Sequence, residues 1–171
     1  MNSVGRLLSR HLQGLAPGKV TWIGLRPERK VAMQVVDSTH AIAGFGLAGD
    51  RRCKGQKGSA RQVTLINQEH IDLVAKLLGK ASIDPGMLRR NIVVTGINLV
   101  ALRHQRFQIG DVIFEGGAHC HPCVRMEQAL GKGAVAAMLG HGGICAKVLT
   151  NGTIHTGEAL IKLDDQLHLD L

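Results

Sequence analysis

The sequence predicts a mainly β protein, built as a small β-barrel or curled sheet with a few short helices on its outside. Many short apolar segments are separated by turn residues, and 22 of the 171 residues are glycine. Strand-like and helix-like segments do not alternate regularly, which argues against a doubly wound parallel sheet. Aromatic residues make up only 2% of the chain, so aliphatic side chains must form the core. The length predicts one domain, residues 1–171.

The N-terminal segment, residues 1–18, places Arg6 and Arg10 among leucines and predicts an arm or helix packed on the domain. A short amphipathic targeting segment is the alternative interpretation of the same pattern. The apolar runs that follow predict strands because they are short and bounded by turn residues. The predicted strands are residues 19–25, 30–36, 62–66, 92–94, 112–115, 144–150, 153–155 and 159–163.

Helical spacing of apolar residues predicts a helix over residues 68–78, with Asn67 as its N-terminal cap and Gly79 at its end. A shorter helix is predicted over residues 134–139. Pro85-Gly86 predicts a turn. Asn151-Gly152 suits a tight hairpin turn and predicts that the strands on either side of it pair with each other.

The formal net charge of +8 predicts an anionic ligand. Scarce aromatic residues argue against base stacking on nucleic acid, and the basic residues are dispersed along the chain, so we expect a phosphate-bearing small molecule and no nucleic acid. No apolar run reaches transmembrane length, and we expect no membrane partner. Four unevenly spaced cysteines do not resemble a disulfide scaffold and favour a reducing, cytoplasmic compartment.

Two basic segments are candidates for the anion site. Asp50 and Arg51 precede the loop 54–61, which contains Lys57 and Arg61 among glycines that let backbone N–H groups approach a ligand. A solvated loop is the competing interpretation. In the second segment Arg89 and Arg90 directly precede a predicted buried strand, which predicts either a structural ion pair or an anion site.

The segment 117–125 concentrates the reactive side chains, with two thiols and two imidazoles within five residues. A helix is predicted to follow Cys123, and both a helix N-terminus and the nearby Arg125 favour the thiolate form. Cys123 is therefore the first candidate for a nucleophile or metal ligand. The alternatives are a buried structural cysteine pair, a structural zinc site that combines the two cysteines with His119 or His121 and with His141 or Cys145, and a thiol redox pair formed by Cys120 and Cys123.

Six motifs occur in a fixed order along the chain: Gly46-Leu47-Ala48-Gly49-Asp50-Arg51, Val63-Thr64-Leu65-Ile66, Pro85-Gly86-Met87-Leu88-Arg89-Arg90-Asn91-Ile92-Val93, Phe107-Gln108-Ile109-Gly110, Cys120-His121-Pro122-Cys123 and Gly142-Gly143-Ile144. In this order they resemble the MOSC domain, the module found at the C-terminus of molybdenum cofactor sulfurases. The resemblance covers the chain from about Val20 onward and implies a closed β-barrel.

The resemblance also implies binding of molybdenum cofactor, a pterin (molybdopterin) with a phosphate and a dithiolene-held metal. Cys123 matches the functional cysteine of the family, which ligates molybdenum in reductases of N-hydroxylated compounds; a persulfide on Cys123 would instead make the chain a sulfur carrier. Arg89 and Asn91 fall on cofactor-contacting positions, and Asn67 lies near another. The full set of expected cofactor contacts is Asp50, Arg51, Lys57, Arg61, Asn67, Arg89, Asn91, Cys120 and Arg125.

The same resemblance sets expectations for other molecules. The sulfurases also have a pyridoxal phosphate domain, and pyridoxal phosphate is not expected in this chain alone. The expected protein partner is a separate cysteine desulfurase or an electron-transfer protein. The reductases also tend to have an extra N-terminal region over the cofactor, where this chain has only its arm and first strands.

Overall fold

A closed barrel of seven strands forms the body of the protein in the computed structural model, which describes residues 11–164. The strands follow the order β11-β7-β8-β9-β5-β6-β1, and β1 pairs with β11 to close the ring. The barrel strands are β1 (Gly18–Leu25), β5 (Val63–Asn67), β6 (Ile92–Thr95), β7 (Arg106–Ile109), β8 (Val112–His119), β9 (Ile144–Val148) and β11 (Ala159–Lys162). The prediction of a mainly β, closed barrel is confirmed.

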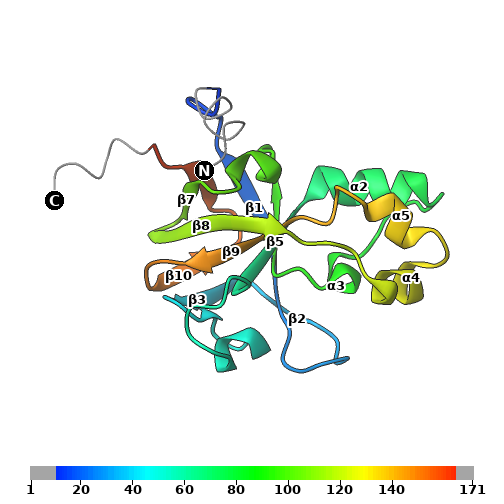
Figure 1. The fold of residues 1–171 in the computed structure, drawn as a ribbon, viewed down its shortest axis with the longest axis horizontal. Coiled ribbons are helices and arrows are strands. Elements are labelled where there is room, and N and C mark those ends of the chain that lie inside the picture. Colours follow the sequence, from blue (N-terminus) through cyan, green and yellow to red (C-terminus); the bar gives the residue numbers. More distant parts are fainter. Residues whose placement is uncertain (1–10, 165–171) are drawn as a thin grey trace, which may run out of the picture.

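Shorter elements surround the barrel (Figure 1). Strand β2 (Gln34–Val36) extends the barrel sheet at β1, and β10 (Gly152–His155), β3 (Ser38–Ile42) and β4 (Gly46–Leu47) form a separate sheet. The described residues contain four α-helices, α2 (Gln68–Leu77), α3 (Pro85–Leu88), α4 (Val124–Leu130) and α5 (Ala134–Met138), and two 3-10 turns, η1 (Arg51–Lys54) and η2 (Leu99–Leu102). The α-helices lie together on one side of the barrel.

Two apolar clusters hold these layers together. The first fills the barrel, where Phe107 and Phe114 are fully buried and stack with ring centroids 5.4 Å apart. The second lies between the barrel and the helices, where Ile71 and Val74 of α2 meet Met126 of α4. Burying each such side chain stabilises the fold by about 1.5–3 kcal/mol. The helices are therefore fixed against the barrel by their own apolar faces.

Strand β8 runs four residues further than predicted, to His119. The strand continues through Gly116 and Gly117, and only its register with β9 shifts there. A Cβ at Gly116 would overlap the carbonyl of Leu102. This glycine therefore allows η2 to cross close to the strand, and the longer strand delivers Cys120 to the end of the barrel.

Three local predictions are corrected. The strands on either side of Asn151-Gly152 do not form a hairpin, because β9 pairs with β8 and β5 while β10 pairs with β3. Pro85-Gly86 begins the short helix α3, since Asp84 caps it by accepting a hydrogen bond from the Gly86 N–H. Asn67 occupies the N-cap position of α2, but its side chain makes no cap hydrogen bond.

The predicted N-terminal arm lies largely outside the structure, because residues 1–10 are not among those described. Residues 11–17, which are described, form turns and irregular backbone. None of the helices in residues 11–164 is long and apolar enough to cross a membrane.

Candidate functional site

Cys123 is exposed at the N-terminus of α4, as the sequence predicts. It is the N-cap residue, with extended backbone (φ −136°, ψ 174°), and its side chain makes no cap hydrogen bond. Pro122 lies just before the cap. Helix α4 packs on α3, which ends at Leu88 and is followed by its C-cap residue, Arg89. The thiol therefore stands free at the side of the barrel where the helices gather.

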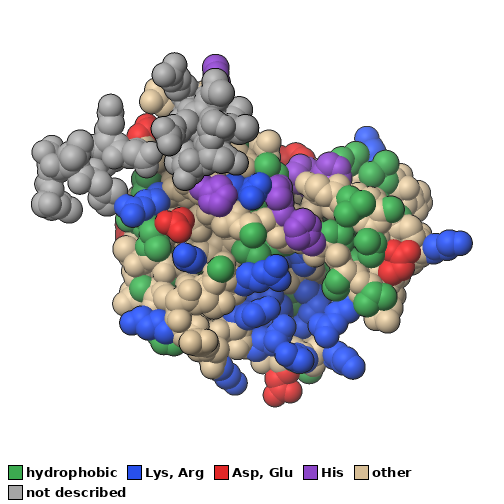
Figure 2. Space-filling model, viewed as in Figure 1, with side chains coloured by type: hydrophobic (Ala, Val, Ile, Leu, Met, Phe, Trp, Pro, Cys, Tyr) green, Lys and Arg blue, Asp and Glu red, His purple; other side chains and the backbone are tan. Residues whose placement is uncertain are grey.

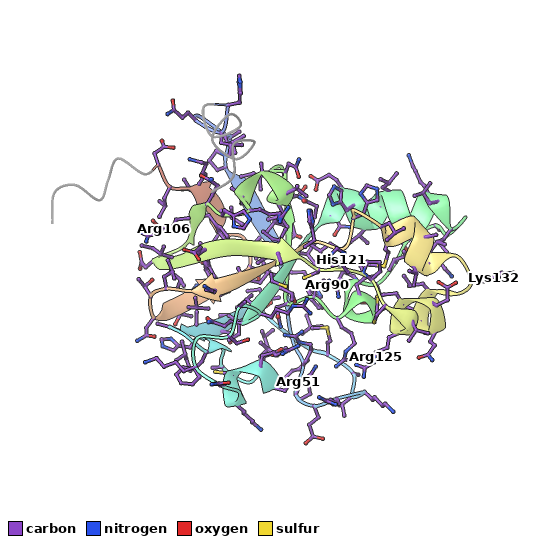
Figure 3. All side chains as sticks on the ribbon, in the orientation of Figure 1. Arg51, Arg90, Arg106, His121, Arg125 and Lys132 are labelled. Atoms are coloured by element: carbon purple, nitrogen blue, oxygen red, sulfur yellow. The ribbon has the colours of Figure 1, made fainter. Side chains whose placement is uncertain are left out.

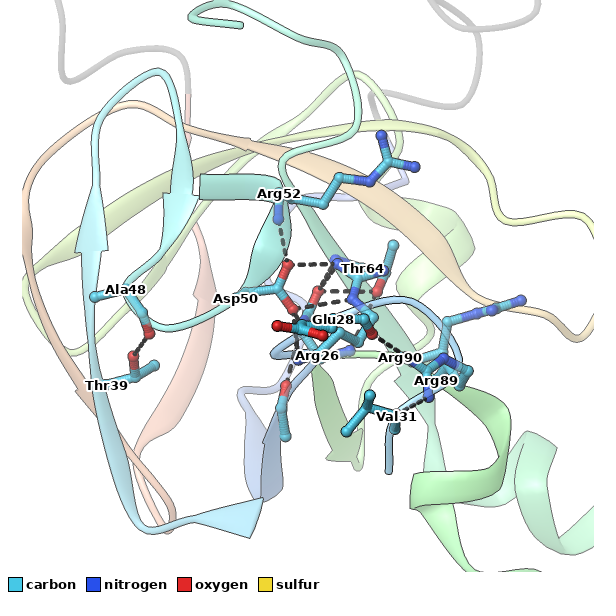
Figure 4. Close-up of polar contacts among 12 residues, drawn as sticks. Arg26, Glu28, Val31, Thr39, Ala48, Asp50, Arg52, Thr64, Arg89 and Arg90 are labelled. Atoms are coloured by element: carbon cyan, nitrogen blue, oxygen red, sulfur yellow. Dashed lines mark hydrogen bonds and ion pairs between the residues drawn. The ribbon is translucent and has the colours of Figure 1, made fainter. Parts of the chain in front are cut away.

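A buried polar network lies beneath this side of the barrel (Figure 4). The Asp50 carboxylate, 1% exposed, accepts hydrogen bonds from Arg26 Nε at 2.9 Å and from Arg26 Nη2 at 3.1 Å. The backbone N–H groups of Arg26 and Arg52 donate to the same carboxylate. Burial raises the pKa of Asp50, but hydrogen bonds and charge from Arg26 outweigh it and hold that pKa below its usual range.

Asn91 completes the network and is fully buried. Its Oδ1 accepts a hydrogen bond from Arg26 Nη2 at 2.9 Å, and its Nδ2 donates to Asp50 Oδ2 at 2.8 Å. It also bonds the backbone of Gly24 and Thr64 on neighbouring strands. The polar side-chain atoms of Asp50 and Asn91 form hydrogen bonds with each other, with Arg26 and with backbone groups. Both side chains are therefore buried and hydrogen-bonded within the protein. Their direct contact with a ligand stays a prediction.

Six arginines lie close to this network or to Cys120 and Cys145, and we call them the arginine cluster: Arg51, Arg52, Arg61, Arg89, Arg90 and Arg125. Figure 2 shows Lys and Arg side chains gathered on this face, with histidines along one edge. Figure 3 shows that three of the arginines come from three different elements: Arg51 from η1, Arg90 from the segment before β6, and Arg125 from α4. Burial lowers the pKa of Arg51, and neighbouring arginine charges lower it further. The pKa of Arg89 is lowered by burial and by the charges of Arg26 and Arg125.

The cluster lacks carboxylate partners. Among residues 11–164, the only arginine–carboxylate ion pair joins Arg26 to Asp50. Arg89, in the left-handed conformation (φ 57°), donates from its guanidinium to the carbonyls of Val31 and Glu28. Arg90 donates to the carbonyls of Gly142 and Leu88. The structural ion pair that we weighed for these two arginines is therefore not formed in the described part of the chain.

Two polar atoms of the cluster are buried without a hydrogen-bond partner among the described residues, Arg51 Nε and Arg90 Nη2. Leaving a buried donor unsatisfied costs about 1–3 kcal/mol, and more when the group is charged. A cluster that keeps unneutralised guanidinium groups and unsatisfied donors has the chemistry of a site for an anion with several acceptor oxygens.

Cys120 is buried and lies next to Cys145, whereas the sequence suggests a pair with Cys123. Its Sγ is 3.2 Å from Sγ of Cys145 in β9. Both thiols are free. The hydrogen bond between the two sulfurs lowers the pKa of Cys145, burial opposes the shift, and the charges of Arg61 and Arg90 lower the pKa further. The same contact and burial raise the pKa of Cys120.

The structure brings most of the predicted site residues to one side of the barrel. Asp50, Arg51, Arg61, Arg89, Asn91, Cys120 and Arg125 belong to the cluster, to the network below it or to the thiol pair beside it. Lys57 does not join them, since its exposed side chain passes beside Gly44 in the turn between β3 and β4. Asn67 bonds the backbone of Ile97 and Leu99. It lies three residues beyond Thr64 on β5, which is about 10 Å along a strand.

Three residues of this region were not among the predicted cofactor contacts or the predicted anion-site arginines. Arg26 was assigned to a turn, and only the fold reveals its pairing with Asp50 24 positions later. Arg52 follows Arg51, so the doubled arginine was the available signal. Cys145 lies between Ile144 and Ala146 in an apolar run; the sequence suggests it only as a possible zinc ligand, and nothing in that pattern pairs it with Cys120.

The zinc alternative finds no support in residues 11–164. No group of three or more His, Cys, Asp or Glu side chains there could hold a metal ion. His119 accepts a hydrogen bond at Nε2 from Arg103 Nη1 at 2.9 Å, and His121 is exposed. Cys120 faces Cys145, so the two thiols of the Cys-x-x-Cys segment lie in different environments, one buried and one exposed.

Comparison with known families agrees with this barrel. The family model of the MOSC domain matches residues 50–161, a range that includes Asp50 and Asn91 of the network, the arginine cluster and both cysteines of the thiol segment, while Arg26 lies before it. The chain therefore belongs to the MOSC family.

Solved structures of small bacterial proteins share the fold. The YuaD protein from Bacillus subtilis superposes with a TM-score of 0.72 at 20% identity, over 85% of this chain and 94% of that one. YiiM from Geobacillus stearothermophilus gives 0.69 at 14% identity over 89% and 78%, and YiiM from Escherichia coli gives 0.66 at 16% over 85% and 70%. No curated protein matches the sequence.

Proposed function

We propose that this MOSC protein binds molybdenum cofactor on the arginine cluster, with the Cys123 thiolate as the protein ligand to molybdenum. The observation that supports the proposal is the exposed Cys123 thiol on α4, a helix whose first turn also places Arg125 beside Arg89 in a cluster without carboxylate partners. A single face thus offers a soft ligand for the metal and hard cationic groups for a phosphate.

The residues present fit that group. Thiolate sulfur is a suitable ligand for a soft transition metal. The planar guanidinium groups match phosphate oxygens, and the unpartnered Arg51 Nε and Arg90 Nη2 are donors that a phosphate or pterin oxygen can satisfy. When bound, the cofactor supplies oxidation–reduction chemistry at its metal, while the protein binds it, orients it and sets the charge around it.

We assign the bound protein to the reductases of N-hydroxylated compounds. Family membership supports this assignment. Such a reductase needs an electron donor, so we propose an electron-transfer protein as partner. We place the activity in the reducing cytoplasm, because all four cysteines are free thiols.

The test uses protein purified from cells that make the cofactor, with metal content measured by mass spectrometry. We expect molybdenum in the wild-type protein and its loss in Cys123→Ala. Cys53→Ala is the matched control, because Cys53 is a half-buried thiol of η1, outside the thiol segment, and should retain the metal. Equal molybdenum in Cys123→Ala and wild type would refute ligation by this sulfur.

A second candidate function uses the same residue as a sulfur carrier. The exposure of Cys123 favours it, because a persulfide there would be open to a separate cysteine desulfurase and to an acceptor. Protein produced together with a desulfurase should gain one sulfur atom on Cys123, detected by mass spectrometry of the peptide without reduction. An unmodified Cys123 in that experiment would leave the reductase as the only proposal.

A further inference from the structure

A second pair of sulfurs lies behind the exposed Cys123. Cys120 follows the last residue of β8, and its backbone N–H donates to the carbonyl of Gly143, just before β9. Cys145 is two residues further along β9, which brings it to the same face of the sheet as Cys120. The two Sγ atoms are 3.2 Å apart, and the side chains are 8% and 2% exposed. A disulfide bond needs about 2.05 Å between them.

Positively charged side chains around Cys120 and Cys145 favour oxidation of these thiols. Arg90 and Arg61 place positive charge near both sulfurs, and one buried donor of Arg90, Nη2, has no partner among the described residues. Cations near a thiol stabilise the thiolate, which is the form that attacks an oxidant. A structural cysteine pair in a purely apolar core lacks that assistance.

We propose that Cys120 and Cys145 form a dithiol centre that hydrogen peroxide oxidises reversibly to a disulfide. The Cys145 thiolate attacks one peroxide oxygen, the O–O bond breaks, hydroxide leaves and a sulfenic acid forms on Cys145. Cys120 sulfur then attacks Cys145 sulfur, the S–O bond breaks, and the Cys120 proton leaves with the hydroxide as water. Overall two thiols and one peroxide give one disulfide and two waters, and an external dithiol reverses the change.

The bond would tie the first residue after β8 to β9, three positions before Cys123. Cys120 could then no longer pair with Cys123, so oxidation of the buried pair leaves the exposed thiol free. This pairing differs from the Cys-x-x-Cys link that the sequence indicates. The proposal does not depend on cofactor binding, because every measurement below uses protein without cofactor.

The test isolates the pair in a Cys53→Ala/Cys123→Ala variant, in which Cys120 and Cys145 are the remaining cysteines. The reduced protein is exposed to excess hydrogen peroxide, quenched with catalase, denatured and alkylated with a maleimide. We expect an intact mass lower by two hydrogens, no alkylation, and recovery of two alkylated thiols after treatment with dithiothreitol. The same variant with Cys145→Ser added should never show the loss of two hydrogens.

Wild-type protein gives a second measurement that does not depend on the folding of the variant. Peptide mapping after the same oxidation should recover Cys120 linked to Cys145. Two alkylatable thiols after oxidation, an oxidised Cys145 that dithiothreitol does not restore, or a wild-type link between Cys120 and Cys123 would each overturn the proposal.

Discussion

Replacing Asp50 with asparagine should destabilise the protein by about 3–5 kcal/mol, the usual cost of removing one partner of a buried ion pair. The carboxylate is 1% exposed, and two donors converge on Oδ1 while three converge on Oδ2. In the variant, the asparagine oxygen can accept from the three donors that now bond Oδ2. Its NH₂ group then faces Arg26 Nη2 and the Arg52 N–H, which are also donors, so those two hydrogen bonds are lost. Losing two such hydrogen bonds at about 1.5–3 kcal/mol each gives a similar figure.

The assay is urea unfolding followed by the fluorescence of Trp22, the only tryptophan in the chain, which lies on β1 four residues before Arg26. Glu115→Gln is the matched control, because the Lys147–Glu115 pair is 3.7 Å apart and its side chains are 42% and 40% exposed. An exposed pair contributes about 0–1 kcal/mol. Asp50→Asn should therefore lower the urea midpoint far more than the control does.

The pH dependence gives an independent check on the same carboxylate. Because the pKa of Asp50 is lowered in the folded state, the stability it contributes is fully present above the unfolded value and is lost as pH falls through the folded pKa. The unfolded value is about 3.9. The difference in stability between wild type and Asp50→Asn should thus be constant near neutral pH and shrink below about pH 4. A loss no larger than that of Glu115→Gln, or a difference that does not change with acid, would refute the buried ion pair.

Three further predictions follow from other parts of the structure. Gly143→Ala should destabilise the protein in urea unfolding by more than roughly 1–2 kcal/mol, the cost of placing an alanine in the left-handed conformation, because the added Cβ would overlap a backbone carbonyl of β5. Gly58→Ala is the control: its φ is similar (82° against 88°) but a Cβ there meets open space, so only the conformational cost is expected. His70→Gln should reduce the stability that the protein loses between neutral pH and pH 5. Burial lowers the pKa of His70 in the folded state, and the charge of His141 lowers it further, so on acidification His70 is protonated in the unfolded chain before it is protonated in the folded protein. A thermal-melting pH profile that is the same in wild type and variant would contradict this. Arg125→Gln should lower molybdenum content without lowering the urea midpoint, because the side chain is exposed on α4 and we propose that it contacts the cofactor; unaltered metal content would remove Arg125 from the site.

Much of the barrel can be predicted from the sequence because local signals and long-range packing agree there. Strand β1 and helix α2 appear within one or two residues of the predicted bounds, since both bury one apolar face. The Asn151-Gly152 hairpin fails because a tight-turn signal is local, whereas β9 buries Ile144 and Val148 by pairing with β8 and β5. Closure of β1 on β11 joins residues 140 positions apart, and no local pattern encodes such a contact.

The candidate site divides in the same way. Cys123 is predictable because helix-start chemistry lies within a few residues of it, and the structure places it at the N-cap of α4. The partner of Cys120 is not predictable, because the competing thiol at Cys123 is three positions away in sequence while the true neighbour is 25 positions away. The sequence shows only how far apart the cysteines are along the chain. The pairing of β8 with β9 in the fold is what places Cys120 beside Cys145 and not beside Cys123.

The buried network explains why the surface above it stays cationic. The buried Asp50 carboxylate accepts two hydrogen bonds from the Arg26 guanidinium beneath the surface. It forms no ion pair with Arg51 or Arg89. Burial lowers the pKa of both arginines, and the charges of Arg26 and of other neighbouring arginines lower it further, while the charge of Asp50 partly opposes the shift. Repulsion of this kind raises the free energy of the ligand-free protein, and an anion relieves it on binding. The same ion pair thus stabilises the fold and reserves the arginine cluster for a ligand.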